Sequence, residues 1–510
     1  MKNKYVPFLC TFVTLLIVCL FINPLKWSYR SNFQVVTEDR PYGFEPVNCW
    51  FSPSSDWPIS ECYYMNVPED HSTSGSKTIS FPVVVFRSPS LITNKMPVLH
   101  LGAGGPGAPM YLDSTASIKN IWSNHDELSI NQGRDLFIID PRGTGLSKPL
   151  LMCDNFVSNQ IERFKKNLSL GVLWKKINKD YFTCIERFKN QGIKLSTYNS
   201  LSIANDIEMM RKAARIDKWV LVGVSYAATY AQVIATKNPS SVESMILDSA
   251  TFPSIKSHDS FIKRSMAGYE ALYNYCLNDN SCSRPLPNLK KRIWSLHKQL
   301  NNSPIPMFIE HPYENKSIQI ILNGERLLAA FIQGTYNEQI FIDLPKIITE
   351  LETRKHTSIT PYINDLAAYL LDKTYGDVST ISHYCYEDKP FTDFELIQKL
   401  AGKLPEGYIR STTLLALEQP DYCDEIQIES VDPIVSMPTR TDIPVLFLHG
   451  ELDSITLLSN VIKQKKAFIN STLIRYQLSH DILGSSECAE IAAAKFIKGY
   501  KMDMLTCEEI

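Results

Sequence analysis

The stretch WVLVGVSYA, at residues 219–227, decides our interpretation of the fold. It opens with four apolar residues, mostly aromatic or β-branched, which indicate a buried strand. Gly223 and Ala227 are small and allow a sharp turn into the helical stretch that follows. Ser225 lies on that turn, in the form known for a nucleophilic serine exposed at the end of a strand. The usual pattern is G-x-S-x-G, and Ala227 stands in place of its last glycine.

Strands and helices alternate on both sides of this turn. An amphipathic helix is expected at 203–214, and strands at 62–67, 81–86, 98–101, 135–140, 219–222 and 244–248. Strands that alternate with helices are typical of a mostly parallel sheet covered by helices on both faces. The sequence therefore predicts an α/β fold.

The pattern changes between about residues 253 and 439. Apolar runs typical of strands become scarce, and amphipathic helical stretches such as 289–300 and 344–351 dominate. The strand pattern returns at 443–448 and 473–478. We therefore predict one sheet built from residues 31–252 and 440–510, with a helical cap at 253–439 inserted between its two parts. A separate structural domain is the alternative interpretation of the insertion.

The N-terminus has the pattern of an export segment. Lys2 and Lys4 precede an apolar stretch at 5–22, which Asn23 and Pro24 end. Residues 1–30 are therefore expected to be a signal peptide or a signal anchor. We favour an uncleaved anchor, because no small-x-small cleavage site follows. The protein is then extracytoplasmic, either periplasmic or secreted, and touches the membrane only through this segment.

Cysteine usage agrees with export. Ten of the twelve cysteines lie outside residues 1–30, and an even number in an exported chain suggests disulfides. Sequence leaves the connectivity open, but the simplest arrangement pairs neighbours at 49–62, 153–184, 276–282, 385–423 and 488–507. There is no C-x-x-C pair, which argues against a zinc ribbon or a thioredoxin-type site.

The composition is that of an ordinary globular protein. Hydrophobic residues make up 44% and charged residues 21% of the 510 residues. The formal net charge of −2 gives no reason to expect a nucleic-acid partner. We expect a monomer.

A serine nucleophile needs a base within hydrogen-bond reach, and the base needs a carboxylate that orients it. Asp453 follows the apolar strand at 445–448, and His480 follows the last strand. Like Ser225, both residues come at the C-terminal end of a strand. In a parallel sheet these strand ends meet at one edge. We therefore predict a Ser225–His480–Asp453 triad.

Three other residues compete for roles in that triad. Asp248 also ends a strand and could orient the histidine, although a structural hydrogen bond is the preferred interpretation. His449 lies inside the end of its strand, which suggests packing. Glu451 is a lesser alternative for the acid.

An oxyanion formed at Ser225 needs two backbone N–H donors. One is expected from Tyr226, the residue after the serine. The second is expected from the glycine-rich loop at 102–107, where we favour Gly105 and keep Gly104 as an alternative. A phosphate-binding loop is excluded because no Gly-Lys-Ser/Thr follows the glycines.

Four motifs resemble those of the prolyl aminopeptidase and tripeptidyl aminopeptidase family of α/β hydrolases. They are G-G-P-G at 104–107, D-x-R-G-x-G-x-S at 140–147, G-x-S-Y at 223–226 and G-x-x-D at 450–453. The secreted tripeptidyl aminopeptidases with a TAP-like C-terminal segment are the most similar branch. The resemblance covers about residues 49–499 and implies an α/β-hydrolase fold with a helical cap.

Two residues depart from the family pattern. Ala103 stands where many relatives carry histidine, and Ala227 replaces a glycine. The family's cap supplies a carboxylate for the substrate's N-terminal ammonium, and Glu387 is the residue here that most resembles it. Asp388 is adjacent to it. The sequence therefore leaves open whether Glu387 binds the ammonium group or is merely solvated.

The resemblance implies a serine exopeptidase that hydrolyses short peptides from a free N-terminus through an acyl-enzyme. This chemistry requires no metal and no organic cofactor. A carboxylesterase or lipase with the same triad is the main alternative. A hydrolase fold that only binds ligands is a weaker alternative, because it would be expected to have lost one of the triad residues.

Overall fold

The computed structural model of the chain describes residues 42–89, 95–402, 422–428 and 430–499. The predicted export segment at 1–30 lies outside them. Within the described residues, no helix has both the length and the apolar character needed to cross a bilayer.

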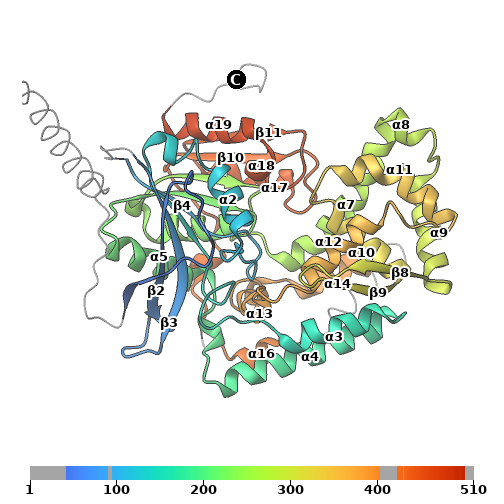
Figure 1. The fold of residues 1–510 in the computed structure, drawn as a ribbon, viewed down its shortest axis with the longest axis horizontal. Coiled ribbons are helices and arrows are strands. Elements are labelled where there is room, and N and C mark those ends of the chain that lie inside the picture. The colour runs from blue at the N-terminus through green and yellow to red at the C-terminus, as the bar shows by residue number, and fades with distance from the viewer. Residues whose placement is uncertain (1–41, 90–94, 403–421, 429, 500–510) are drawn as a thin grey trace, which may run out of the picture.

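A nine-stranded sheet forms the centre of the described structure (Figure 1). Its strands are, in spatial order, β1 (Gly43–Val47), β2 (Ile59–Pro68), β3 (Thr78–Arg87), β5 (Leu136–Ile139), β4 (Val98–His100), β6 (Trp219–Val224), β7 (Val242–Asp248), β10 (Val445–Gly450) and β11 (Ser471–Tyr476). The pairs β1–β2, β2–β3 and β3–β5 are antiparallel, and every pair from β5 to β11 is parallel. The predicted mostly parallel sheet is confirmed, and β1 is a strand that the sequence did not predict.

Alternate residues of the central strands point to opposite faces, and each face is buried under helices. On one face, Leu221 of β6 packs in a cluster with α5 (Ser200–Ala213) and α6 (Ala227–Lys237). On the other face, Val220 and Val222 pack in a cluster with α2 (Thr115–Ser123) and α19 (Glu487–Ile497). Both sides of the strand are therefore dry, which explains its continuous apolar run.

A helical region lies beside the sheet, on the right and along the lower centre of Figure 1. It contains the helices α3 (Asp154–Phe164), α4 (Leu170–Asn190), α7 (Ser257–Asn278), α8 (Asn280–Ser283), α9 (Leu289–Asn302), α10 (Gly324–Gly334), α11 (Gln339–Glu352), α12 (Thr360–Leu370), α13 (Asp377–His383), α14 (Phe394–Gly402) and α16 (Tyr422–Ile426). A hairpin of β8 (Ile305–Glu310) and β9 (Ser317–Leu322), which the sequence did not predict, belongs to the same region.

One hydrophobic cluster unites this region and extends beyond the predicted insertion. It includes Phe164 of α3 and Phe188 of α4, which precede residue 253 in the chain. It also includes Phe331 of α10 and Phe341 of α11. The helical region is thus assembled from two separate parts of the chain, and the boundaries 253–439 stay a prediction.

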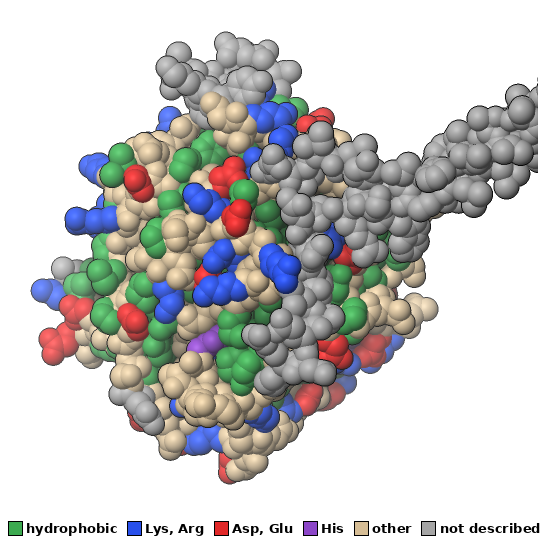
Figure 2. Space-filling model, turned by 90° about the vertical axis from the view of Figure 1, so that its left-hand side faces the viewer, with side chains coloured by type: hydrophobic (Ala, Val, Ile, Leu, Met, Phe, Trp, Pro, Cys, Tyr) green, Lys and Arg blue, Asp and Glu red, His purple; other side chains and the backbone are tan. Residues whose placement is uncertain are grey.

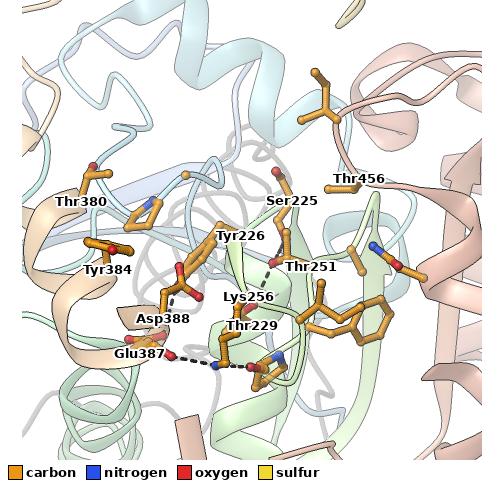
Figure 3. Close-up of a pocket in the computed structure, with 18 of the residues that line it drawn as sticks. Ser225, Tyr226, Thr229, Thr251, Lys256, Thr380, Tyr384, Glu387, Asp388 and Thr456 are labelled. Atoms are coloured by element: carbon orange, nitrogen blue, oxygen red, sulfur yellow. Dashed lines mark hydrogen bonds between the residues drawn. The ribbon is translucent and has the colours of Figure 1, made fainter. Parts of the chain in front are cut away.

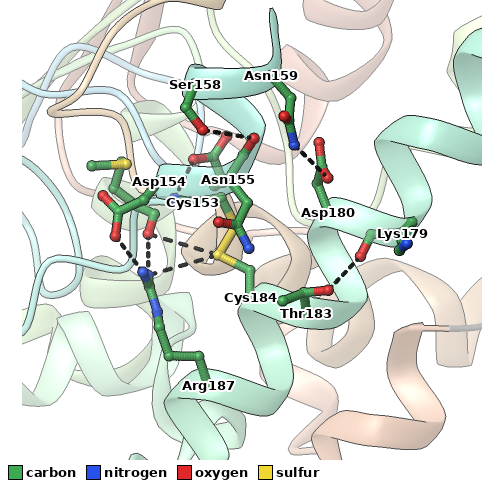
Figure 4. The surroundings of a disulfide bond; sticks show 12 residues. Cys153, Asp154, Asn155, Ser158, Asn159, Lys179, Asp180, Thr183, Cys184 and Arg187 are labelled. Atoms are coloured by element: carbon green, nitrogen blue, oxygen red, sulfur yellow. Dashed lines mark hydrogen bonds and ion pairs between the residues drawn. A yellow bond between two sulfur atoms is a disulfide. The ribbon is translucent and has the colours of Figure 1, made fainter.

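Disulfides join four of the five predicted cysteine pairs: Cys49–Cys62, Cys153–Cys184, Cys276–Cys282 and Cys385–Cys423. The fifth predicted pair includes Cys507, which lies outside the described residues. Figure 4 shows how Cys153–Cys184 ties the start of α3 to α4, with Arg187 donating a hydrogen bond of 2.7 Å to the carbonyl of Met152. The three bonds within the helical region therefore fix its helices to one another.

Charges of both signs are mixed over the face drawn in Figure 2. This distribution agrees with the formal net charge of −2. It gives that face no broad basic surface of the kind that binds a nucleic-acid backbone.

The D-x-R-G-x-G-x-S segment builds the loop after β5 through buried hydrogen bonds. Asp140 is buried and accepts hydrogen bonds from the backbone N–H of Met110, 2.6 Å, and of Leu146, 3.0 Å. Gly145 approaches it so closely that a Cβ would lie 2.0 Å from Asp140 Oδ2. Burial raises the pKa of Asp140 to about 7. The motif's acid and glycine are therefore required for the loop to close.

Arg142, in the same loop, forms a buried hydrogen-bond network. Its Nε and Nη2 donate to the two carboxylate oxygens of Asp206 on α5, at 2.7 and 2.6 Å. It also donates to the carbonyls of Glu69 and Thr197, at 2.7 and 3.0 Å. Both charged side chains are almost fully buried. A bidentate pair with further acceptors offsets the cost of desolvating the guanidinium.

Replacing Arg142 by alanine is expected to lower the free energy of unfolding by about 3–5 kcal/mol, because Asp206 would stay buried without its bidentate partner. Chemical denaturation followed by circular dichroism measures this. The matched control is Arg292→Ala, since Arg292 forms an ion pair with Glu352 near the surface. That substitution is expected to cost less than about 1 kcal/mol. Equal losses in the two variants would contradict the account.

Candidate active site

Ser225 lies directly after β6 on a strained turn. Its φ of 55° is in the left-handed region, and its backbone N–H donates to the carbonyl of Asp248 at 2.9 Å. The helix α6 starts so close that a Cβ on Gly223 would lie 2.7 Å from the carbonyl oxygen of Ala227. Glycine is therefore required at 223. Ala227 is fully buried and fits the turn with its methyl group, so the departure from the usual motif is accommodated.

The glycine-rich loop after β4 passes against this turn. Gly104 and Gly105 have φ values of 88° and 48°. A Cβ on Gly104 would lie 2.6 Å from the Cβ of Ser225. No hydrogen bond joins the backbone N–H of Gly105 or of Tyr226 to any other described residue. Two N–H groups at the predicted positions are thus available beside Ser225.

Asp453 and His480 form a hydrogen-bonded pair. His480 Nδ1 and Asp453 Oδ2 are 3.0 Å apart. Asp453 is held in turn by Thr456, whose hydroxyl and backbone N–H donate to it at 2.6 and 2.9 Å, and by the N–H of Ile455 at 2.8 Å. Among the described residues there is no hydrogen bond between Ser225 Oγ and His480, although both line one cavity. Such contacts are often long in unliganded sites and tighten when substrate binds.

Electrostatics favour the charged form of the pair. Burial alone lowers the pKa of His480, but the charge and hydrogen bond of Asp453 outweigh it and raise the pKa above its ordinary value. Burial opposes ionisation of Asp453, yet its neighbour His480 keeps the pKa of Asp453 below the ordinary value. The ring of Tyr336 packs edge-on against His480, with centroids 5.1 Å apart. The imidazole is thus held by a carboxylate on one side and an aromatic ring on another.

Two of the three competing residues have other partners, and the third, His449, lies beside Asp453 itself. Asp248 accepts from the N–H of Leu483 at 2.7 Å and so anchors the segment that follows His480. His449 is fully buried, with Nε2 3.9 Å from Asp453 Oδ2, and burial lowers its pKa. Glu451 accepts a hydrogen bond from Gln477 at 2.9 Å near the surface.

Two cavities meet at Ser225. The smaller, of about 380 Å³, is lined by Glu387, Asp388 and Lys256 among others, and we call it the Glu387 cavity. The larger, of about 690 Å³, contains His480, and we call it the His480 cavity. Gly105, Tyr336 and Tyr369 line both. The serine therefore stands between two spaces of different chemistry.

Glu387 lies in a π-helical turn at Tyr384–Asp388, across the Glu387 cavity from Ser225 (Figure 3). It is 2% exposed, and burial raises its pKa. Its carboxylate accepts from the hydroxyl of Ser200 at 2.8 Å, from that of Tyr226 at 2.9 Å, and from the backbone N–H of Ser200. A carboxylate can accept about four hydrogen bonds, so about one position remains for a ligand.

Sequence reasoning missed two features of this cavity. Lys256 Nζ donates to the carbonyls of Pro253 and Glu387, at 2.6 and 2.7 Å, and so braces the π-helical turn. Tyr336 and Tyr369 stand between the two cavities. These side chains come from the helical region, where no spacing rule identifies them.

The helical region also holds the glycine-rich loop. The backbone N–H of Gly376 donates to the carbonyl of Gly107 at 2.8 Å. The hydroxyl of Ser379, on α13, donates to the carbonyl of Pro106 at 3.0 Å. The same short segment leads into the turn that carries Glu387. Both sides of the site are thus fixed by one piece of the chain.

Comparison with known proteins agrees with this architecture. The chain matches the α/β hydrolase fold family over residues 102–304 and the TAP-like protein family over residues 413–507.

Three relatives are similar over part of the chain. YuaR of Escherichia coli (strain K12) is 27% identical over 278 residues, covering 51% of this chain and 51% of YuaR. Serine protease Hip1 of Mycobacterium tuberculosis (strain H37Rv) is 23% identical over 230 residues, covering 43% and 42%. Tripeptidyl aminopeptidase of Streptomyces lividans is 26% identical over 215 residues, covering 40% and 38%. The chain thus spans about half the length, or less, of the curated relatives it matches.

NMR titration of histidine-labelled protein is expected to give His480 a pKa above the ordinary value of about 6.5. In Asp453→Asn the pKa is expected to fall, because the opposing charge is removed while the burial remains. Asp217→Asn is the control, since Asp217 is an exposed residue before β6, at the opposite end of that strand from Ser225. An unchanged His480 pKa in Asp453→Asn would contradict the proposed coupling.

Proposed function

We propose that the chain, which has the α/β-hydrolase fold and matches the TAP-like protein family over residues 413–507, is a serine exopeptidase that acts on short peptides from a free N-terminus. The observation that carries this proposal is the arrangement around Ser225. A hydrogen-bonded Asp–His pair lies on one side of the serine, and a buried carboxylate lies across the cavity on the other. The disulfides support a location outside the cytoplasm.

The proposed reaction proceeds through an acyl-enzyme. Ser225 Oγ attacks the scissile carbonyl while His480 takes its proton, and Asp453 orients the imidazole. The N–H groups of Tyr226 and Gly105 stabilise the oxyanion. The C–N bond then breaks as His480 returns the proton to the leaving amine. Water, activated by His480, finally releases the acyl part as a free acid.

The position of His480 orients the substrate. The leaving amine must reach the histidine that protonates it, so the leaving peptide occupies the His480 cavity. The acyl part, which carries the N-terminus, then occupies the Glu387 cavity. This places the ammonium group on the same side of Ser225 as Glu387 and Asp388. Proton transfer from His480 and binding of the N-terminus by the carboxylate therefore require the same orientation of the substrate.

Glu387 is proposed to bind that ammonium. A charge-assisted hydrogen bond in a site removed from water is worth about 1.5–3 kcal/mol. An acetylated N-terminus offers neither the charge nor the three donors, so it would leave the buried carboxylate without this partner. The cavity thus favours peptides with a free N-terminus over esters with an apolar acyl chain.

The test compares hydrolysis of a chromogenic tripeptide amide, the same amide acetylated at its N-terminus, and a short-chain nitrophenyl ester. We expect cleavage of the free amide, loss of cleavage on acetylation, and no activity in Ser225→Ala. Glu387→Gln is expected to lower kcat/KM for the free amide by about 10- to 100-fold.

Glu395→Gln is the matched control, since Glu395 is exposed on α14. Thermal unfolding of Glu387→Gln checks that its contacts with Ser200 and Tyr226 survive. Ester turnover without cleavage of either amide would overturn the peptidase proposal and leave an esterase. Equal cleavage of the free and acetylated amides would overturn the role of the N-terminus.

A further inference from the structure

We propose that the His480 cavity selects peptides in which a cationic residue, lysine or arginine, follows the scissile bond. This inference rests on the proposed function, which directs the leaving peptide into that cavity. It concerns the leaving side of the substrate, whereas Glu387 concerns the N-terminal side.

Acidic side chains line the His480 cavity. Asp372 and Asp481 both line it, and no lysine or arginine does so among the described residues. The imidazole of His480, which also lines it, is paired with the carboxylate of Asp453. Asp372 is 5% exposed and is fixed by the hydroxyl of Tyr111 at 2.8 Å and by the N–H and hydroxyl of Thr374 at 2.7 and 2.6 Å. Three hydrogen bonds therefore hold this carboxylate in place in the cavity wall. A cation nearby is favoured, and an acidic side chain is repelled.

Aromatic rings also line the His480 cavity. Tyr111, Tyr336, Tyr369 and Tyr375 surround the same space. The rings of Tyr369 and Tyr375 meet edge to face, with centroids 5.6 Å apart. Ammonium and guanidinium groups bind to aromatic faces, and the stems of lysine and arginine pack along apolar surface. The four tyrosines therefore suit the whole side chain as well as its charge.

A third cavity gives room for a long side chain. It has a volume of about 350 Å³ and shares Ala103, Tyr111 and Asp481 with the His480 cavity. His100 and His125 line it, and burial lowers the pKa of both, to about 4 for His125. Both imidazoles are therefore neutral at neutral pH and add no positive charge. Ala103 is small and exposed, and it lines both spaces.

The experiment uses the full chain and four peptides with the same free N-terminal tripeptide. They differ only in the residue after the scissile bond, which is lysine, arginine, leucine or glutamate. Mass spectrometry gives kcat/KM for each. We expect lysine and arginine to exceed glutamate by at least about tenfold, with the difference shrinking at high salt.

Two variants test the two carboxylates, and a third tests the space available to a long side chain. Asp372→Asn and Asp481→Asn are each expected to reduce the lysine-to-glutamate ratio by up to about fivefold. Asp217→Asn, with the same change of charge far from the site, should leave the ratio unchanged. Ala103→Leu is expected to slow cleavage before lysine more than cleavage before alanine, which is measured with a fifth peptide.

The outcomes separate this inference from the proposed function. Ser225-dependent cleavage of all peptides at equal rates, or a preference for glutamate, would overturn the inference and leave the exopeptidase intact. A lysine preference that persists in both asparagine variants would overturn the role of the carboxylates. Failure to cleave any of the peptides would overturn the proposed function itself.

Discussion

The left-handed backbone of Ser225 is the constraint on which the rest of the site depends. A residue with φ of 55° between a strand and a helix exposes its side chain, but it forces neighbouring backbone into close approach. Gly223 is needed where α6 begins, and Gly104 is needed where the glycine-rich loop passes the serine. The sheet supplies the rigidity that holds this turn, because β6 is paired on both sides and buried on both faces.

The helical region does more than cover that edge of the sheet. Its segment from Gly376 to Glu387 starts with a hydrogen bond to the glycine-rich loop and ends at the buried carboxylate. The disulfide Cys385–Cys423 lies two residues before Glu387 and ties the π-helical turn to α16. The loop proposed to stabilise the oxyanion and the group proposed to bind the N-terminus are therefore held at a fixed separation. A fixed separation is what an exopeptidase needs in order to cleave at a constant distance from the N-terminus of its substrate.

The sequence predicted the parts of the structure that local rules determine. The strand, turn and helix around Ser225 follow from residue size, and the strands that precede Asp453 and His480 end at the same edge because the sheet is parallel. The four described disulfides join sequence neighbours. The roles assigned to the three residues stay proposals.

Other features depend on packing that no local pattern reveals. The helices α3 and α4 carry ordinary amphipathic sequences, and only their shared cluster with α10 and α11 attaches them to the helical region. The tyrosines around the two cavities come from separate loops and helices. Lys256 belongs to no motif, and the hydrogen bonds by which it braces the π-helical turn go to backbone carbonyls. These contacts become visible only once the chain is folded.

The most direct test of the central claim is to trap the serine and identify it. The protein would be treated with a peptidyl diphenyl phosphonate that has a free N-terminus and, separately, with its acetylated form. Peptide mapping by mass spectrometry would then locate the adduct. The account predicts a single adduct on Ser225, formed faster by the free form and lost in His480→Gln. An adduct on another residue, or equal rates for the two forms, would contradict it.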